Sequence, residues 1–291
     1  MQHWQRWNGK EMNCSMSKIR ILAHRGASYH APENTKAAFV KAYDFSVSGI
    51  ETDLQLTADG EIVIHHNYYI DSTSDGKGAI ALKNLDELKR YDFGSYKGKQ
   101  FAGEKILTLS RLLPVLKDFS LINLELKSHM DKSVDFVGKI LETVAASGMK
   151  DKILYSSFDE NLLREIKQRS SESRVGLLTM RESMGRMSAE FTANMAAKYG
   201  VTDFRRTLEK AGKIQTLEER VDSLDFEIDC LHPDYHSVLD NPSLVEKMHS
   251  KGIQVNPYTC DDLREMKLLK EAGCDAIITN RPDIARALWE E

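Results

Sequence analysis

The sequence predicts a closed (β/α)₈ barrel, or TIM barrel, with a small insertion after the early strands. Short β-branched apolar segments alternate with helix-like segments from residue 18 onward, and this alternation is typical of parallel strand pairing. A chain of 291 residues has room for about eight such units, which suits a closed barrel better than an open sheet. Polar and titratable residues also lie at the ends of several predicted strands, where α/β enzymes carry their chemistry.

The predicted strands are short apolar runs that end at polar or glycine-containing turns. They cover residues 19–24, 49–56, 61–66, 121–127, 152–157, 174–179, 225–231, 253–258 and 275–279. The second and third strands are separated only by Ala58-Asp59-Gly60, which predicts an antiparallel hairpin within the otherwise parallel series.

The predicted helices fall between most of these strands. The first begins near Asn34 or Thr35, either of which is a suitable N-cap residue. The helices cover residues 35–46, 109–118, 132–147, 159–169, 183–198, 204–222, 242–251, 261–272 and 282–290.

Three segments depart from the alternation. Residues 1–16 are polar and predict an N-terminal extension or tag-like tail, which leaves residues 17–291 as a single domain. Residues 67–105 are rich in Gly, Ser, Asp and Lys and predict a small insertion with a helical stretch at 82–91. Residues 180–224 predict a helical excursion, which is either a lid or substrate wall or an extra pair of outer helices.

Composition narrows the class of protein. The net charge of −4 argues against a general nucleic-acid binder, which carries a basic surplus. Because no apolar run reaches about 18 residues, we expect no integral membrane segment. The four cysteines show no Cys-x-x-Cys spacing and fit reduced thiols, so we expect a cytoplasmic protein. The oligomeric state stays open.

Three carboxylates are candidate metal ligands. Strand alternation places Glu51 and Asp53 on one face of the second strand, within ~7 Å of each other. Glu125 and Lys127 share one face of a later strand in the same way. Hard carboxylate oxygens are the ligands that Mg²⁺ and Ca²⁺ prefer, so we expect one of these divalent cations as cofactor.

Two histidines and two cations complete the candidate site. His24 and His66 end the first and third predicted strands and suit an acid–base pair, because imidazole titrates near neutral pH. Arg25 and Lys127 would supply positive charge to phosphate oxygens. Such a set matches the needs of phosphodiester hydrolysis, namely charge neutralisation, an activated nucleophile and a protonated leaving group.

The ordered motifs resemble the glycerophosphodiester phosphodiesterase family and span nearly the whole chain. They are His24 to Ala27, Pro32 to Thr35, Glu51 with Asp53, Asp59 to His66, Asn123 to Lys127, Ser157-Phe158 and Gly273 to Pro282. The resemblance implies hydrolysis of a small-molecule glycerophosphodiester to an alcohol and sn-glycerol 3-phosphate. It also implies a route in which the neighbouring glycerol hydroxyl attacks first and forms a cyclic phosphate, with one histidine as base and the other as acid. The sequence does not assign these two roles.

Three positions differ from the family pattern. Asn67 replaces an aspartate after His66, and Ser72 stands where an arginine is common. Tyr258 replaces a tryptophan and is a possible substrate wall, although it suits the core equally well. These differences leave the metal ligands and histidines intact and leave the head-group preference open.

Other interpretations remain at this stage. A single Glu-x-Asp motif on a strand usually marks a solvent-facing side of that strand. Lys127 beside Glu125 can be a simple surface pair. The same fold can serve a lysophospholipid-type phosphodiesterase, a non-catalytic barrel that binds a phosphorylated ligand, or an aldolase or isomerase that uses Lys127. His65 points to the opposite strand face and is predicted to be structural; weaker candidates for the site are His30, His129, His232 and His236.

Overall fold

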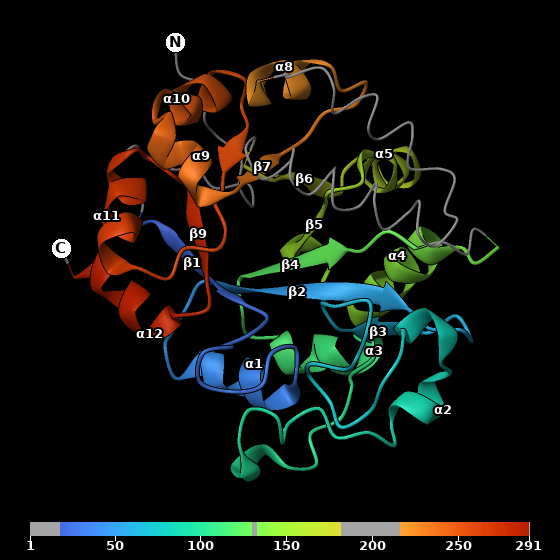
Figure 1. Cartoon of the computed structure of the whole chain (residues 1–291). Helices are drawn as coiled ribbons and strands as arrows, with labels where there is room; N and C mark the ends of the chain where they lie inside the picture. The colour runs from blue at the N-terminus through green and yellow to red at the C-terminus, as the bar shows by residue number, and fades with distance from the viewer. Residues whose placement is uncertain (1–17, 130–132, 182–215, 291) are drawn as a thin grey trace, which may run out of the picture.

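The computed structural model describes residues 18–129, 133–181 and 216–290. Eight parallel strands run in the order β8-β7-β6-β5-β4-β2-β1-β9 and form a nearly closed barrel (Figure 1). Backbone hydrogen bonds from Asp275 to Val255 and from Ile278 to Pro257 connect the two ends of the series. The predicted fold class is therefore confirmed. The strands are β1 Arg20–His24, β2 Gly49–Leu56, β3 Ile62–Ile64, β4 Leu121–Leu126, β5 Ile153–Ser157, β6 Arg174–Thr179, β7 Cys230–Pro233, β8 Gln254–Val255 and β9 Ala276–Thr279.

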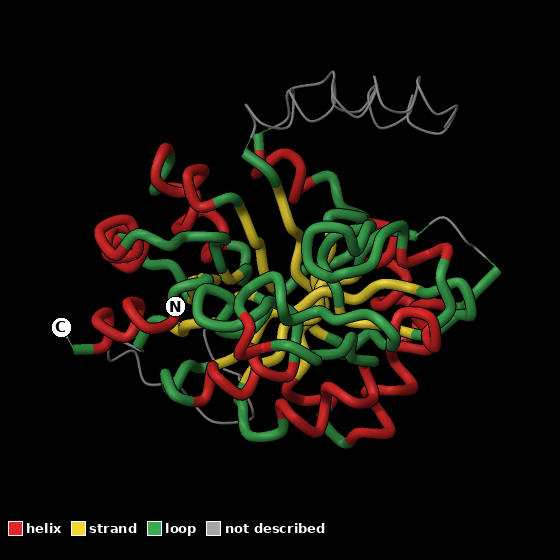
Figure 2. The backbone as a smooth tube through the Cα atoms, turned by 60° about the horizontal axis from the view of Figure 1, so that its bottom comes forward, coloured by secondary structure: helices red, strands yellow, loops and turns green. Residues whose placement is uncertain are grey.

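Helices surround the strands on the outside of the barrel (Figure 2). Several first turns are capped by side chains: Thr35 accepts from the amide of Ala38, and Asp159 accepts from that of Asn161. The α-helices are α1 Lys36–Tyr43, α2 Leu85–Leu88, α3 Leu109–Leu112, α4 Phe136–Ser147, α5 Glu160–Arg169, α8 Leu217–Asp222, α9 Tyr235–Asp240, α10 Ser243–Ser250, α11 Leu263–Glu271 and α12 Pro282–Ala285. Among the described residues, no helix is both long enough and apolar enough to cross a membrane.

Two apolar layers hold the barrel together. The larger lies between the strands and the outer helices and includes the buried side chains of Phe39, Ile50 and Phe136. The smaller cluster comprises Leu22, Leu121, Leu154, Cys230, Ala276 and Ile278. By strand alternation, this cluster lies on the same strand faces as the polar residues two positions further along. It therefore forms an apolar layer beneath those polar side chains.

The predicted hairpin is present, because β3 pairs antiparallel to β2 with Leu54 opposite Ile64. Residues 67–105 follow β3 and contain α2 and two short 3₁₀ turns, Ile80–Leu82 and Lys99–Phe101. A separate small core comprises Val63, Ile70, Ile80, Leu88, Phe93 and Ile106. This core fixes the segment after β3 without using the main core of the barrel.

Several predicted boundaries were wrong for physical reasons. The predicted strand 225–231 starts only at Cys230, although Phe226 and Ile228 still pack on the core and produced the alternating pattern. Of the predicted strand 253–258 only Gln254–Val255 has regular strand geometry, although the amides of Asn256 and Tyr258 still donate to the carbonyls of Leu231 and Pro233; Pro257 has no amide to donate. The predicted helix 109–118 becomes a 3₁₀ helix at Leu113–Leu116, which contains Pro114.

Other differences concern helices near the end of the chain. Helix α9 was not predicted, although Asp234 at its start caps it by accepting from the amide of His236. The predicted helix 282–290 is split into α12 and a 3₁₀ helix at Arg286–Trp289. The predicted tail 1–16, the helix 183–198 and residues 182–215 of the predicted excursion lie outside the described residues.

Candidate active site

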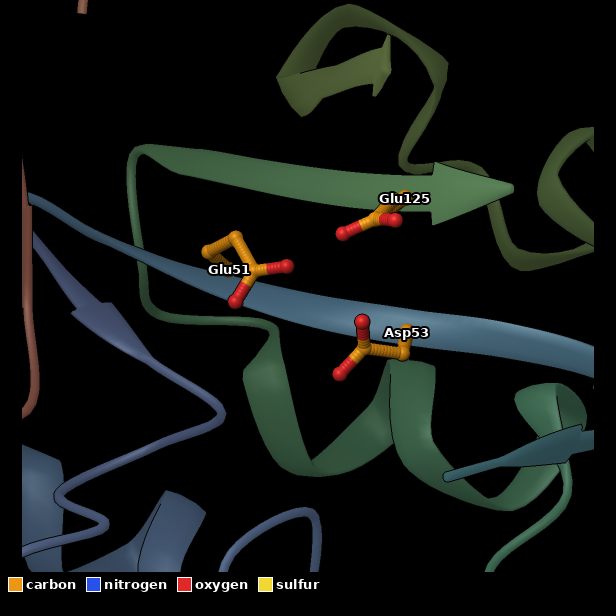
Figure 3. A group of neighbouring side chains, drawn as sticks. All are labelled: Glu51, Asp53 and Glu125. Atoms are coloured by element: carbon orange, nitrogen blue, oxygen red, sulfur yellow. The ribbon is translucent and has the colours of Figure 1, made fainter. Parts of the chain in front are cut away.

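The three predicted carboxylates meet inside the barrel. Asp53 on β2 lies opposite Glu125 on β4 in the parallel register, and Glu51 lies two residues earlier on the same face of β2. Oxygen atoms of all three side chains lie within 4.8 Å of one another, and each side chain is buried. Figure 3 shows the carboxylates directed into the same space between β2 and β4. Strand alternation and register alone place them together.

Lys127 and Arg25 face this cluster. The Lys127 ammonium lies 2.5 Å from Oε1 of Glu125 and 2.9 Å from Oδ1 of Asp53. The Arg25 guanidinium lies 3.4 Å from Oδ2 of Asp53 through Nε, and its Nη1 lies 2.8 Å from Oε1 of Glu33. Both predicted phosphate-binding residues therefore lie at the cluster, where they partly neutralise its carboxylates.

The two cationic side chains affect the pKa values of the three carboxylates unequally. Burial raises the pKa of Asp53, but Lys127 and Arg25 outweigh burial and hold that pKa well below its usual value. Burial, followed by repulsion from Asp53 and Glu125, raises the pKa of Glu51 well above its usual value. Burial likewise raises the pKa of Glu125 to about 7, against the opposing effect of Lys127.

A divalent cation fits this donor set. Three buried carboxylates face two cationic side chains, one of which also pairs with Glu33. The raised pKa of Glu51 follows from burial and this excess of negative charge. A bound divalent ion relieves the same repulsion, and an all-oxygen set suits Mg²⁺ or Ca²⁺. Glu51, Asp53 and Glu125 are thus the residues that can hold it.

His24 is oriented by a residue 256 positions away. Its Nδ1 lies 2.7 Å from Oδ1 of Asn280, the residue directly after β9. The Asn280 amide nitrogen donates to Oδ2 of Asp261 at 2.7 Å, and Ser28 donates to Oδ1 of Asn280 at 2.7 Å, so this oxygen is the acceptor. The network assigns the proton of neutral His24 to Nδ1. Its Nε2 then faces Oε2 of Glu51 at 3.7 Å.

His66 is held in the same manner. Its Nδ1 lies 2.8 Å from Oδ1 of Asn67, and the Asn67 amide nitrogen donates to Oγ of Ser72 at 3.0 Å. The side chain of Gln55 lies 2.8 to 3.0 Å from the carbonyl oxygens of His65, His66 and Asn67, which fixes this loop on β2. In both histidines the asparagine contact therefore lies at Nδ1 and not at Nε2.

Burial keeps both histidines neutral. Desolvation, followed by the positive charge of Arg25, lowers the pKa of His24 to about 3. Desolvation also lowers the pKa of His66, although Asp53 acts in the opposite direction. An anion bound near either imidazole would favour the protonated form and raise the pKa of that ring.

Three residues that were not predicted to belong to the site hold it in place. Asn34 donates to Oδ2 of Asp53 at 2.8 Å and accepts from the hydroxyl of Thr52 at 2.8 Å. Its backbone has a positive φ of 58°, a conformation that asparagine tolerates better than most residues. Asn280 and Gln55 are the other two. The available signal for these two was their position directly after β9 and within β2, whereas Asn34 lies in the loop before α1 and gave only a helix-capping signal.

A pocket of about 260 Å³ opens beside the carboxylates. Its lining includes the buried side chains of Glu125 and Lys127, the imidazole of His66, and the exposed rings of Tyr68 and Phe158. Tyr258 packs on Phe158 in a T-shaped arrangement at a centroid distance of 6.1 Å, and its hydroxyl donates to the carbonyl of Thr179. Its predicted role as a substrate wall stays a proposal.

The remaining histidines lie away from the carboxylates. His65 is buried, and its ring nitrogens lie within hydrogen-bond distance of the Asn67 carbonyl and the Thr73 hydroxyl, in line with a structural role. His30 pairs with Asp283, His236 with Asp234, and His232 lies beside Asn256. His129 packs its ring edge against Phe136.

The sequence model of the glycerophosphoryl diester phosphodiesterase family matches residues 24–284. A glycerophosphodiester phosphodiesterase of Caldanaerobacter subterraneus subsp. tengcongensis is 31% identical to this chain, over 91% of this chain and 96% of the relative. The uncharacterised protein YqiK of Bacillus subtilis is 30% identical, over 92% and 98% of the two chains.

Solved structures share the fold. A phosphodiesterase of Oleispira antarctica, determined with its product sn-glycerol-3-phosphate, matches with a TM-score of 0.74 and 25% identity. That match covers 94% of this chain and 97% of the other. A protein of Silicibacter pomeroyi, described as a glycerophosphoryl diester phosphodiesterase by inference, matches with a TM-score of 0.75 and 22% identity, over 95% of each chain.

Proposed function

This chain belongs to the glycerophosphoryl diester phosphodiesterase family, and from that membership we propose that it hydrolyses glycerophosphodiesters to an alcohol and sn-glycerol 3-phosphate. One observation carries the proposal: the buried carboxylates of Glu51, Asp53 and Glu125 and the imidazole of His24 meet at one end of the barrel, beside the pocket that His66 lines. The product complex of the Oleispira antarctica phosphodiesterase supports the choice of substrate class.

Glu51, Asp53 and Glu125 are proposed to hold Mg²⁺ or Ca²⁺. When bound, the cation neutralises a phosphoryl oxygen and lowers the pKa of an attacking hydroxyl. Arg25 and Lys127 are proposed to contact the other phosphate oxygens, since both are fixed beside the carboxylates. The negative charge of the substrate phosphate would then replace part of the pairing that Asp53 and Glu125 give to Arg25 and Lys127.

The histidines are proposed to move the protons. The glycerol hydroxyl next to the phosphate forms a bond to phosphorus while the bond to the alcohol breaks, which gives a cyclic phosphate. One imidazole takes the hydroxyl proton on Nε2, and the other, protonated, donates a proton to the departing oxygen. Water then opens the ring with the two roles reversed. The asparagine contacts of His24 and His66 leave Nε2 as the reacting nitrogen in both.

A second candidate is a lysophospholipid-type phosphodiesterase activity at the same site. Large apolar side chains are exposed on residues 67–105, namely Tyr68 at 52%, Tyr69 at 61% and Leu82 at 82% of their surface. Such a surface can contact an acyl chain or a lipid aggregate. The non-catalytic alternative is less favoured, because Asn67 and Ser72 still hold His66 through hydrogen bonds.

The test follows release of sn-glycerol 3-phosphate from glycerophosphocholine, glycerophosphoethanolamine, glycerophosphoinositol and glycerophosphoglycerol. Release should stop with EDTA and return with Mg²⁺ or Ca²⁺. For the second candidate, lysophosphatidylcholine is the substrate and release of choline is followed instead, because the phosphate product keeps its acyl chain. As a matched control, His236→Ala changes a half-exposed histidine next to Asp234 and should retain activity. A metal-loaded protein that releases product from none of these substrates would overturn the proposal.

A further inference from the structure

The outer half of the pocket carries two exposed aromatic rings. Tyr68 and Phe158 both line the pocket, yet 52% and 40% of their surfaces remain open to solvent. Phe158 is held by the edge of the Tyr258 ring at an interplanar angle of 83°. Rings left open beside a reaction centre offer π-faces to the part of a substrate that extends away from the reacting phosphate.

A fixed carboxylate lies next to these rings. Asp159 directly follows Phe158, and its Oδ2 accepts from the hydroxyl of Ser128, another pocket residue, at 3.1 Å. Its Oδ1 accepts from the amide of Asn161 at 3.0 Å and so caps helix α5. Two anchors therefore hold this carboxylate at the rim of the pocket.

The two halves of the pocket differ in charge. The inner half contains Lys127, whose ammonium is already paired with Asp53 and Glu125, and it is adjacent to the proposed cation site. The outer half offers the exposed aromatic faces of Tyr68 and Phe158, and the Asp159 carboxylate lies next to it through its hydrogen bond with Ser128. An anionic phosphate suits the inner half once a cation is bound, whereas the outer half suits a positively charged group.

We propose that Tyr68, Phe158 and Asp159 form a head-group subsite that favours a cationic alcohol, with the quaternary ammonium of choline as the preferred class. The proposal rests on the proposed function and adds the identity of the leaving alcohol. The ammonium contacts the π-faces of both rings, and the Asp159 carboxylate supplies the opposite charge. A quaternary ammonium has no N–H to donate, so aromatic faces and a nearby carboxylate recognise it better than hydrogen-bond acceptors do.

The test compares kcat/KM for glycerophosphocholine and glycerophosphoglycerol in the metal-loaded protein. The two diesters share the reacting half and differ in the charge of the alcohol. Wild-type protein should favour glycerophosphocholine about tenfold. Tyr68→Leu and Phe158→Leu should each lower kcat/KM for glycerophosphocholine about fivefold to twentyfold and change glycerophosphoglycerol less than about twofold.

Two further variants test the charge of Asp159 and the specificity of the ring contacts. Asp159→Asn removes the charge but keeps a good helix cap, so α5 should stay folded while the preference for glycerophosphocholine falls about threefold to tenfold. Tyr69→Leu alters an exposed ring of the same segment that does not line the pocket, and it should leave both substrates unchanged.

The outcomes separate the subsite from the proposed function. Equal kcat/KM for both diesters in wild-type protein, or equal losses for both in the variants, would overturn the subsite while the phosphodiesterase function stands. A gain for lysophosphatidylcholine over glycerophosphocholine would assign the rings to an acyl chain instead. If no diester is hydrolysed, the subsite is tested by calorimetry of choline binding to the metal-loaded protein. A choline affinity that Phe158→Leu and Asp159→Asn leave unchanged would contradict the subsite.

Discussion

The side-chain oxygen of Asn67 lies 2.8 Å from Nδ1 of His66 and holds the imidazole in one orientation. Its amide nitrogen donates to Ser72 at 3.0 Å, so two of the three positions where this chain differs from the family pattern are in direct contact. A neutral amide–hydroxyl pair occupies the place where the family pattern has an aspartate and an arginine. The orientation of His66 is retained, while the local charge is removed.

This contact predicts the effect of restoring the charge. Asn67→Asp places a carboxylate beside His66 and should raise the pKa of the imidazole, because a negative neighbour favours the protonated ring. The limb of the pH–rate profile that belongs to His66 should move up by about one unit. Adding Ser72→Arg should reverse part of this shift. Identical profiles for wild-type and both variants would show that Asn67 does not act on His66.

Asn280 should matter for rate more than for binding. Asn280→Leu removes the acceptor for Nδ1 of His24 and should lower kcat about 10-fold to 100-fold, with KM changed by less than about threefold. Circular dichroism and thermal melting check that the barrel remains folded. A variant with unchanged kcat would show that the contact with His24 has no part in catalysis.

The cyclic phosphate route makes the glycerol hydroxyl next to the phosphate essential. An analogue of glycerophosphocholine that lacks this hydroxyl should be turned over at least about 10³-fold more slowly, because the intramolecular nucleophile is gone. Synthetic glycerol cyclic phosphate should be opened to a monoester by the same protein. Comparable rates for the analogue and glycerophosphocholine, followed by ³¹P NMR, would indicate direct attack by water.

A surface pair should make stability depend on pH. His249 lies 2.8 Å from Oδ2 of Asp275, and this hydrogen bond raises the pKa of the histidine. The stabilisation is therefore complete below the unfolded pKa of about 6.5 and is lost as the pH rises through the folded value. His249→Gln should lower Tm by about 1–2 °C at pH 5.5, since a half-exposed pair contributes about 0.5 kcal/mol. The difference should vanish near pH 9; an equal loss at both pH values would assign the effect to packing.

The sequence predicted the parts of the site that depend on local periodicity. The pairing of Asp53 with Glu125 follows from the alternation of side chains along two strands, once the fold class is known. The hairpin between β2 and β3 follows from a turn of three residues. The carboxylate pairing needs only side-chain alternation and a parallel register, and the hairpin needs only neighbouring residues.

The contacts that orient the reacting groups needed the structure. Asn280 reaches His24 across 256 positions because β9 closes the barrel beside β1. Alternation puts Gln55 on the same face of β2 as Glu51 and Asp53, yet its contacts with three consecutive carbonyl oxygens depend on how the chain folds back after β3. Side-chain amides of this kind carry no periodic signal, and their partners are set by tertiary packing.

The central claim is that the carboxylates of Glu51, Asp53 and Glu125 hold a divalent cation that the reaction requires. The most direct measurement is a titration of chelator-treated protein with Mg²⁺ or Ca²⁺, in which release of sn-glycerol 3-phosphate and Tm are followed together. Activity should rise from background to a plateau as the cation binds, Tm should increase because the ion binds only the folded chain, and Glu125→Gln should abolish both responses. Full turnover of glycerophosphocholine in the chelator-treated protein, with no added metal, would contradict the claim.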